Sequence, residues 1–103
     1  MPKADAIPAL HALRPGQFQL EGPLTAPHVT RLRAAGLAAL AQGATESRVD
    51  LARVTTVDSA GLALLIDWQA AFQQAGHKLH FVGGPQALHA LARLSDVETL
   101  IYS

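Results

Sequence analysis

The segment from Gly61 to Ala75 limits most strongly how this chain can fold, because it is apolar around most of a helix. On a helical wheel its apolar arc is roughly 200° wide, whereas the apolar arc of an ordinary surface helix is about 100° or somewhat more. Packing on a sheet covers only one face of such a helix. Neighbouring helices or another protein must therefore cover its flanks.

One flank lies close to the start of this helix and carries Leu62 and Ile66. If the neighbouring helices leave it uncovered, we expect these two side chains to contact a partner. Internal packing and partner docking both fit the sequence.

Strand-like and helix-like segments alternate along the rest of the chain. Residues 1–8 are expected to form a flexible tail, and residues 9–22 a hairpin around the turn at 14–17. The later expected elements are a helix that Thr25 caps and Gly43 ends, a strand around Val49–Leu51, a helix over 59–75, a strand over 78–82, a helix over 85–94 with Leu88, Leu91 and Leu94 toward the core, and a short helical turn or strand over 96–103. This order predicts an α/β domain with an N-terminal hairpin and a mixed sheet packed by helices.

Length and composition limit the class of protein. The chain has 103 residues, enough for one domain, which we place at 9–103, and half of them are hydrophobic. Its net charge of zero argues against binding to nucleic acid through bulk charge. No apolar run approaches the roughly 18 residues of a membrane helix, and no signal peptide is visible. We therefore expect a cytoplasmic protein without direct membrane insertion.

Asp58 and Ser59 stand directly in front of the apolar helix. Both residue types are favoured helix caps, because their side-chain oxygens accept hydrogen bonds from the unpaired N–H groups of the first turn. One cap is sufficient, so if Asp58 or Thr56 takes that role, the Ser59 hydroxyl is left free. A phosphate there would meet the positive end of the helix dipole and change the local charge by about −1.5 to −2.

The sequence offers little support for catalysis or metal binding. A nucleophilic serine needs a nearby base, and no motif places a histidine beside Ser59. Asp50 could form a carboxylate pair with Asp58, although a capping or loop-tying role fits it better. His77 and His80 point to opposite faces of a strand and cannot bind one metal together. Cysteine and nucleotide-binding motifs are absent, so we expect no metal or cofactor and favour an interaction module over an enzyme.

The segment VDLARVTTVDSAGLALL at 49–65 resembles the signature of STAS domains, in which a strand and a short loop lead to Asp, a hydroxyl residue, a small residue and Gly at a helix start. QLEGPLT at 19–25, AGHKLHFVG at 75–83 and ALARLSDVETLI at 90–101 are also similar to that family. The resemblance implies a small fold like that of anti-sigma-factor antagonists. It assigns Asp58 and Gly61 to the motif and helix capping, and Asp50 is expected to have a motif or capping role beside them.

With Ala60 and its run of leucines, the motif is most similar to that of the small STAS subunit of the Mla phospholipid ABC transporter. This resemblance implies a non-enzymatic cytoplasmic subunit, peripheral to the inner membrane, that binds and supports the ABC ATPase of a system maintaining outer-membrane lipid asymmetry. Ser59, Ala60, Leu62 and Ile66 are then expected to contact the ATPase.

Anti-sigma-factor antagonists are the alternative that the family offers. In these proteins a partner kinase phosphorylates the hydroxyl residue that follows the aspartate, a position that falls on Ser59 here. They often have a second hydroxyl next, where this chain has Ala60.

Overall fold

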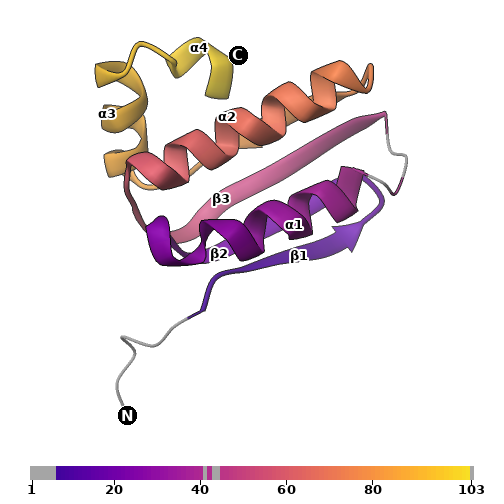
Figure 1. Cartoon of the computed structure of the whole chain (residues 1–103), viewed down its shortest axis with the longest axis horizontal. Coiled ribbons are helices and arrows are strands. Elements are labelled where there is room, and N and C mark those ends of the chain that lie inside the picture. The colour runs from indigo at the N-terminus through magenta and orange to yellow at the C-terminus, as the bar shows by residue number, and fades with distance from the viewer. Residues whose placement is uncertain (1–6, 41, 43–44, 103) are drawn as a thin grey trace.

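A computed structural model of the chain describes residues 7–40, 42 and 45–102. Its elements alternate as the sequence predicts, and the expected α/β class with a mixed sheet is confirmed (Figure 1). In chain order they are β1 (Ala9–Arg14), β2 (Gln17–Leu24), the 3₁₀ helix η2 (Ala26–His28), α1 (Val29–Leu40), β3 (Glu46–Val57), α2 (Ser59–Gln74), β4 (Lys78–Val82), α3 (Gln86–Leu94) and α4 (Glu98–Ile101).

The four strands form one sheet in the order β1-β2-β3-β4. β1 and β2 are antiparallel, whereas β2 with β3 and β3 with β4 are parallel. Alternate residues of β2 are buried, which shows that one face of the sheet is covered. In Figure 1, α1 and α2 lie next to each other along the strands.

Internal packing accounts for the wide apolar arc of α2. The helix contacts the sheet, α1 on one flank, and α3 and α4 on the other. Leu62 is only 4% exposed, so its assignment to a partner-binding surface is wrong for the folded chain. The buried Gln69 donates from Nε2 to the carbonyl of Leu100 at 2.9 Å, which ties α2 to α4. The buried residues of α2 are Gly61, Leu62, Leu64, Leu65, Trp68, Gln69 and Phe72.

β3 is much longer than the strand expected around Val49–Leu51. Gln19 is opposite Asp50 but Glu21 is opposite Arg53, so β3 contains an extra residue between these pairs. The Asp50 carboxylate accepts a hydrogen bond from the N–H of Ala52 at 2.9 Å, within this bulge. Because the bulge breaks the alternation of buried and exposed residues, the sequence pattern indicated too short a strand.

The N-terminal end of the domain includes Pro8, and the C-terminal end is a helical turn. Of the tail expected over 1–8, residues 1–6 lie outside the described residues, but Pro8 is buried. A Cβ placed on Gly22 would lie 2.8 Å from the Cα of Pro8, so Pro8 packs closely on β2. At the other end, residues 98–101 form one helical turn, the first of the two structures expected there.

Two details of the other helices were predicted wrongly. Thr25 stands at the N-cap of η2, but its side chain makes no capping hydrogen bond. The expected helix end, Gly43, lies outside the described residues and stays a prediction.

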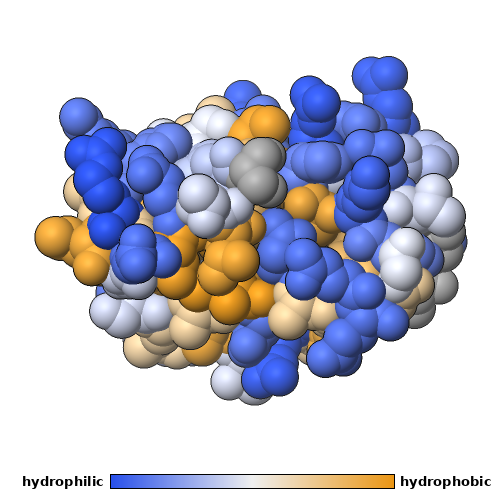
Figure 2. All heavy atoms as spheres, turned by 90° about the horizontal axis from the view of Figure 1, so that it is seen from above, coloured by the Kyte–Doolittle hydropathy of each residue, from blue (hydrophilic) through white to orange (hydrophobic). Residues whose placement is uncertain are grey.

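The second detail concerns α3. There Leu88 is fully buried but Leu94 is 85% exposed. Leu94 lies about 120° around the helix from Leu88, and Ala92 takes the inward position instead. Figure 2 shows apolar residues gathered at the left and centre of the face over α3 and α4, whereas its right half is largely hydrophilic.

Helices α1 and α2 meet at Gly36 and Trp68. Trp68 is 2% exposed, and its Nε1 lies 3.5 Å from the carbonyl oxygen of Arg33, to which it donates. A Cβ placed on Gly36 would overlap the indole ring of Trp68. The close approach of the two helices therefore requires glycine at this position.

We predict that Gly36→Ala destabilises the protein. Alanine in a helix normally gains about 1 kcal/mol over glycine, but overpacking a core typically costs about 1–3 kcal/mol, and a rigid buried indole has little room to move. Urea unfolding should therefore show a lower free energy of unfolding, whereas Ala34→Ser on the exposed face of α1 should change it by less than about 0.5 kcal/mol. A Gly36→Ala variant as stable as the wild type would disprove the close packing.

Candidate functional site

The carboxylate of Asp58 binds the first turns of two helical segments. Asp58 is the N-cap residue of α2, and its Oδ1 accepts from the N–H of Gly61 at 3.0 Å. Its Oδ2 accepts from the N–H of Ala26, at the start of η2, also at 3.0 Å. Asp58 thus supplies the cap that Thr25 does not provide, and it holds the start of η2 against the start of α2.

The hydrogen bonds also change the acidity of Asp58. Partial desolvation acts to raise the pKa of the carboxyl, but the N–H groups of Gly61, Ala26 and Ala60 together outweigh it and hold the pKa below its usual value. The site therefore favours the carboxylate form of Asp58 at neutral pH.

Gly61 belongs to the same turn and is buried. A Cβ on Gly61 would overlap the carbonyl oxygen of Leu24 at the end of β2. The small size of Gly61 is therefore needed for packing inside the domain, and a partner cannot approach the chain through it.

Ser59 and Ala60 form the outer side of this helix start. Ser59 is the first residue of α2 and is exposed, and no hydrogen bond of its hydroxyl occurs among the described residues. Ala60 is half-buried. Ile66 is also half-buried and packs against the core. Ser59, Ala60 and Ile66 thus stay available for contact, while Leu62 does not.

A shallow groove between α1 and α2 begins beside Ala60, and the part that α1 plays in it was not predicted. At its far end Arg33 and Asp67 approach to 3.7 Å, with both side chains at least half exposed. The only signal in the sequence was a pair of small residues at helical spacing, the half-buried Ala60 and the exposed Ala63. The groove is lined by Val29, Thr30, Arg33, Ala60, Ala63, Leu64 and Asp67.

Asp50 does not join this site. It lies in β3 opposite Gln19 and Val82. Asp58 lies eight positions further along the extended chain, roughly 25 Å away at about 3.3 Å per residue. The carboxylate pair considered from the sequence is therefore ruled out. Asp50 stabilises the bulge in β3 by its hydrogen bond to Ala52 and does not cap a helix.

Comparison with known proteins identifies the family to which this fold belongs. The family model described as "Mlab, STAS domain" matches residues 11–102. The chain belongs to the STAS domain family. Among curated proteins, none is similar enough in sequence to count as a match.

The STAS fold is also found in solved structures that resemble this chain. The anti-sigma factor antagonist SpoIIAA in its unphosphorylated form is 18% identical, with a TM-score of 0.73, over 91% of this chain and 84% of that one. The Bacillus cell fate determinant SpoIIAA in its phosphorylated form is 18% identical, with a TM-score of 0.68, over 91% and 87%. At this identity the likeness concerns the fold.

Two further features bear on the interpretation of this STAS domain. Within the described part of the chain, no helix is both long and apolar enough to span a membrane. The same residues contain no group of three or more His, Cys, Asp or Glu side chains placed to hold a metal ion.

We predict that Asp58→Ala lowers the free energy of unfolding at pH 7 by about 1–3 kcal/mol, because two N–H groups lose a charged acceptor. Asp58→Asn should cost less than Asp58→Ala, since its amide oxygen can still accept one of the two hydrogen bonds. The folded pKa of Asp58 is lowered, so its stabilisation is complete above the unfolded pKa of about 3.9 and is lost as the pH falls through the folded value.

Urea unfolding between pH 7 and pH 2.5 would measure this dependence. The difference between the wild type and Asp58→Ala should shrink at the acidic end. Asp67→Asn, on the exposed side of the same helix, is the matched control and should lose little at any pH. A cost of Asp58→Ala that did not vary with pH would show that the carboxylate charge is unimportant.

Proposed function

We propose that this STAS domain is a non-enzymatic subunit that binds and supports the ABC ATPase of a phospholipid transport system. In such a system it would lie in the cytoplasm, peripheral to the inner membrane through its partner, and help to maintain outer-membrane lipid asymmetry. The observation that carries the proposal is the exposed start of α2, with Ser59 unpaired among the described residues beside a groove between two helices. The description of the matching family model supports this system over others.

The geometry suits recognition of a protein surface. Ala60 and Ala63 carry no side chain beyond Cβ, so a partner side chain can approach the backbone of α2 closely. The Arg33–Asp67 pair offers one charge of each sign at the end of the groove, which favours a polar rim around an apolar contact. We place the contact at Ser59, Ala60 and Ala63, with Ile66 at its edge.

The helix start is also rigid before any partner binds. Asp58 fixes the first turn of α2 through Gly61 and the start of η2 through Ala26. Because a rigid surface loses little conformational entropy on binding, this support favours affinity.

We predict that Ser59→Glu weakens binding of the ATPase subunit at least about tenfold, because it adds an unpaired charge to a packed contact, whereas Ser59→Ala binds close to wild type. Ala70→Glu adds the same charge to an exposed position about three turns further along α2 and should not change the affinity. Affinity of the purified domain for the ATPase would be measured with circular dichroism as a check of folding. Equal affinities for the two Glu variants would disprove docking at the helix start.

A second function deserves a test because Ser59 occupies the hydroxyl position of the motif and SpoIIAA has been solved in a phosphorylated form. In this alternative the domain is an anti-sigma-factor antagonist, and a partner kinase modifies Ser59. The exposed hydroxyl could be reached by a kinase. A phosphate there would lie at the positive end of α2 but next to the Asp58 carboxylate.

We predict that, if this alternative holds, incubation with an anti-sigma kinase and ATP adds one phosphate, which Ser59→Ala abolishes and Ser95→Ala does not. Intact-mass measurement of the three proteins decides the matter. An unmodified wild-type protein, with a known substrate of the same kinase modified in parallel, would leave the transporter function as the better explanation.

A further inference from the structure

β1 is an edge strand of the sheet. Within the described residues it pairs only with β2, and its side chains are exposed from His11 to Arg14. Edge strands present unpaired N–H and C=O groups to other strands, and proteins commonly protect them with lysine, with short length or with a covering element. The opposite edge, β4, has five residues and begins with Lys78. β1 has no lysine, and its Leu13 is 58% exposed.

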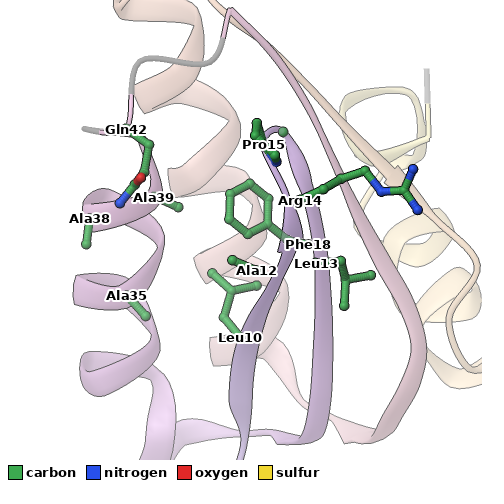
Figure 3. Close-up of a pocket in the computed structure, with 11 residues that line it drawn as sticks. Leu10, Ala12, Leu13, Arg14, Pro15, Phe18, Ala35, Ala38, Ala39 and Gln42 are labelled. Atoms are coloured by element: carbon green, nitrogen blue, oxygen red, sulfur yellow. The ribbon is translucent and has the colours of Figure 1, made fainter.

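Next to β1 lies an apolar groove of about 650 Å³ (Figure 3). Its floor is formed by Leu10 and Ala12 of β1 and Phe18 of β2, and its wall by alanines of α1. Helix α1 does not fully cover β1, since Ala12 on this floor is exposed. Figure 3 shows Leu10, Ala12 and Phe18 on the side of the strands that faces α1. The wall residues are Ala35, Ala38 and Ala39, with Gln42 at one end.

We propose that β1 pairs with β1 of a second copy of this chain, antiparallel and around a two-fold axis. The two four-stranded sheets then join into one continuous sheet. The backbone groups at the outer side of β1 become paired, and the two grooves meet over a shared apolar floor.

The faces of β1 limit the registers that this pairing can take. Leu10 and Ala12 are opposite Leu20 and Phe18, on the helix-covered face, whereas His11 is opposite Gln19 on the other face. Residues that are opposite each other in antiparallel strands share a face, so like faces must meet across the new pair. A two-fold axis through His11 meets this condition. It sets Leu10 against Ala12 of the second copy, a large side chain against a small one.

Charge and symmetry favour a second copy over a different protein. The chain has no net charge, so two copies do not repel each other at long range. Arg14 has no ion-pair partner among the described residues. In this register Arg14 lies near the start of β1 of the second copy, the end at which Glu21 of β2 is located. The Glu21 carboxylate there is hydrogen-bonded to His11 at 3.1 Å. Pairing of β1 with β4 would be heterologous and open-ended, whereas pairing of β1 with itself closes as a dimer.

The first test is the oligomeric state of the full chain by sedimentation equilibrium over a wide concentration range. We expect a monomer–dimer equilibrium. Ala12→Lys should give a folded monomer, because a lysine at this exposed position reaches solvent in the monomer but would lie on the shared floor in the dimer. Ala70→Lys, an equal change on the exposed side of α2, should dimerise like the wild type.

The second test uses the absence of cysteine from the chain. His11→Cys places two thiols opposite each other at the two-fold axis, within the Cα separation that a disulfide needs. Oxidised glutathione should convert this variant into a covalent dimer, while Gln17→Cys on β2 should remain uncrosslinked.

The disulfide of His11→Cys decides the outcome if Ala12→Lys fails to fold. A protein that stays monomeric, that grows into open-ended chains, or that dimerises without forming the His11→Cys disulfide overturns the proposal. None of these results affects the proposed ATPase contact, which uses the start of α2.

Discussion

The two hydrogen bonds of the Asp58 carboxylate connect the parts of the fold on which the candidate site depends. β2 ends at Leu24, whose carbonyl accepts from the N–H of Asp58 at 3.3 Å, and η2 and α1 follow directly. β3 ends next to Leu24 in the sheet, and α2 begins at Ser59. One carboxylate therefore fixes the angle at which both helices leave the sheet, and with it the groove between them. The glycine three residues later is required for the same reason, since the carbonyl of Leu24 occupies the space of a Cβ.

This arrangement separates the roles of neighbouring residues. Asp58 and Gly61 are used by the fold, whereas Ser59 is exposed and makes no side-chain hydrogen bond in the described structure. A change at Ser59 should act on what binds, while a change at Asp58 acts first on stability. Binding data on Asp58 variants alone would therefore confuse a lost contact with a displaced helix. Variants of Ser59 and Ala70 do not have this ambiguity, because both side chains are exposed.

Much of the fold could be predicted from the sequence because local signals and tertiary structure agree. The alternation of Phe18 and Leu20 with polar residues, and the apolar run KLHFV, gave strands that the structure contains. The errors occurred where tertiary contacts decide. The bulge at Ala52 depends on the register of β3 against β2, the burial of Leu62 depends on where α3 and α4 pack, and Leu94 is exposed because it lies about 120° around α3 from the buried Leu88. At the site, the Asp58 cap follows from residue type, but its second bond, to Ala26, is 32 residues distant along the chain and has no sequence signal.

The start of α2 and the edge at β1 are separate surfaces, and this matters for assembly. The first lies between α1 and α2, and the second lies beyond α1 at the outer strand of the sheet (Figure 1). A strand-paired dimer would leave both copies of Ser59 exposed, because no residue of α2 takes part in the pairing. Two-fold symmetry would then present two identical docking sites in a fixed relation. A partner that itself carries two equivalent subunits could engage both sites at once, and binding at the second would be strengthened by the high effective concentration that the first contact creates.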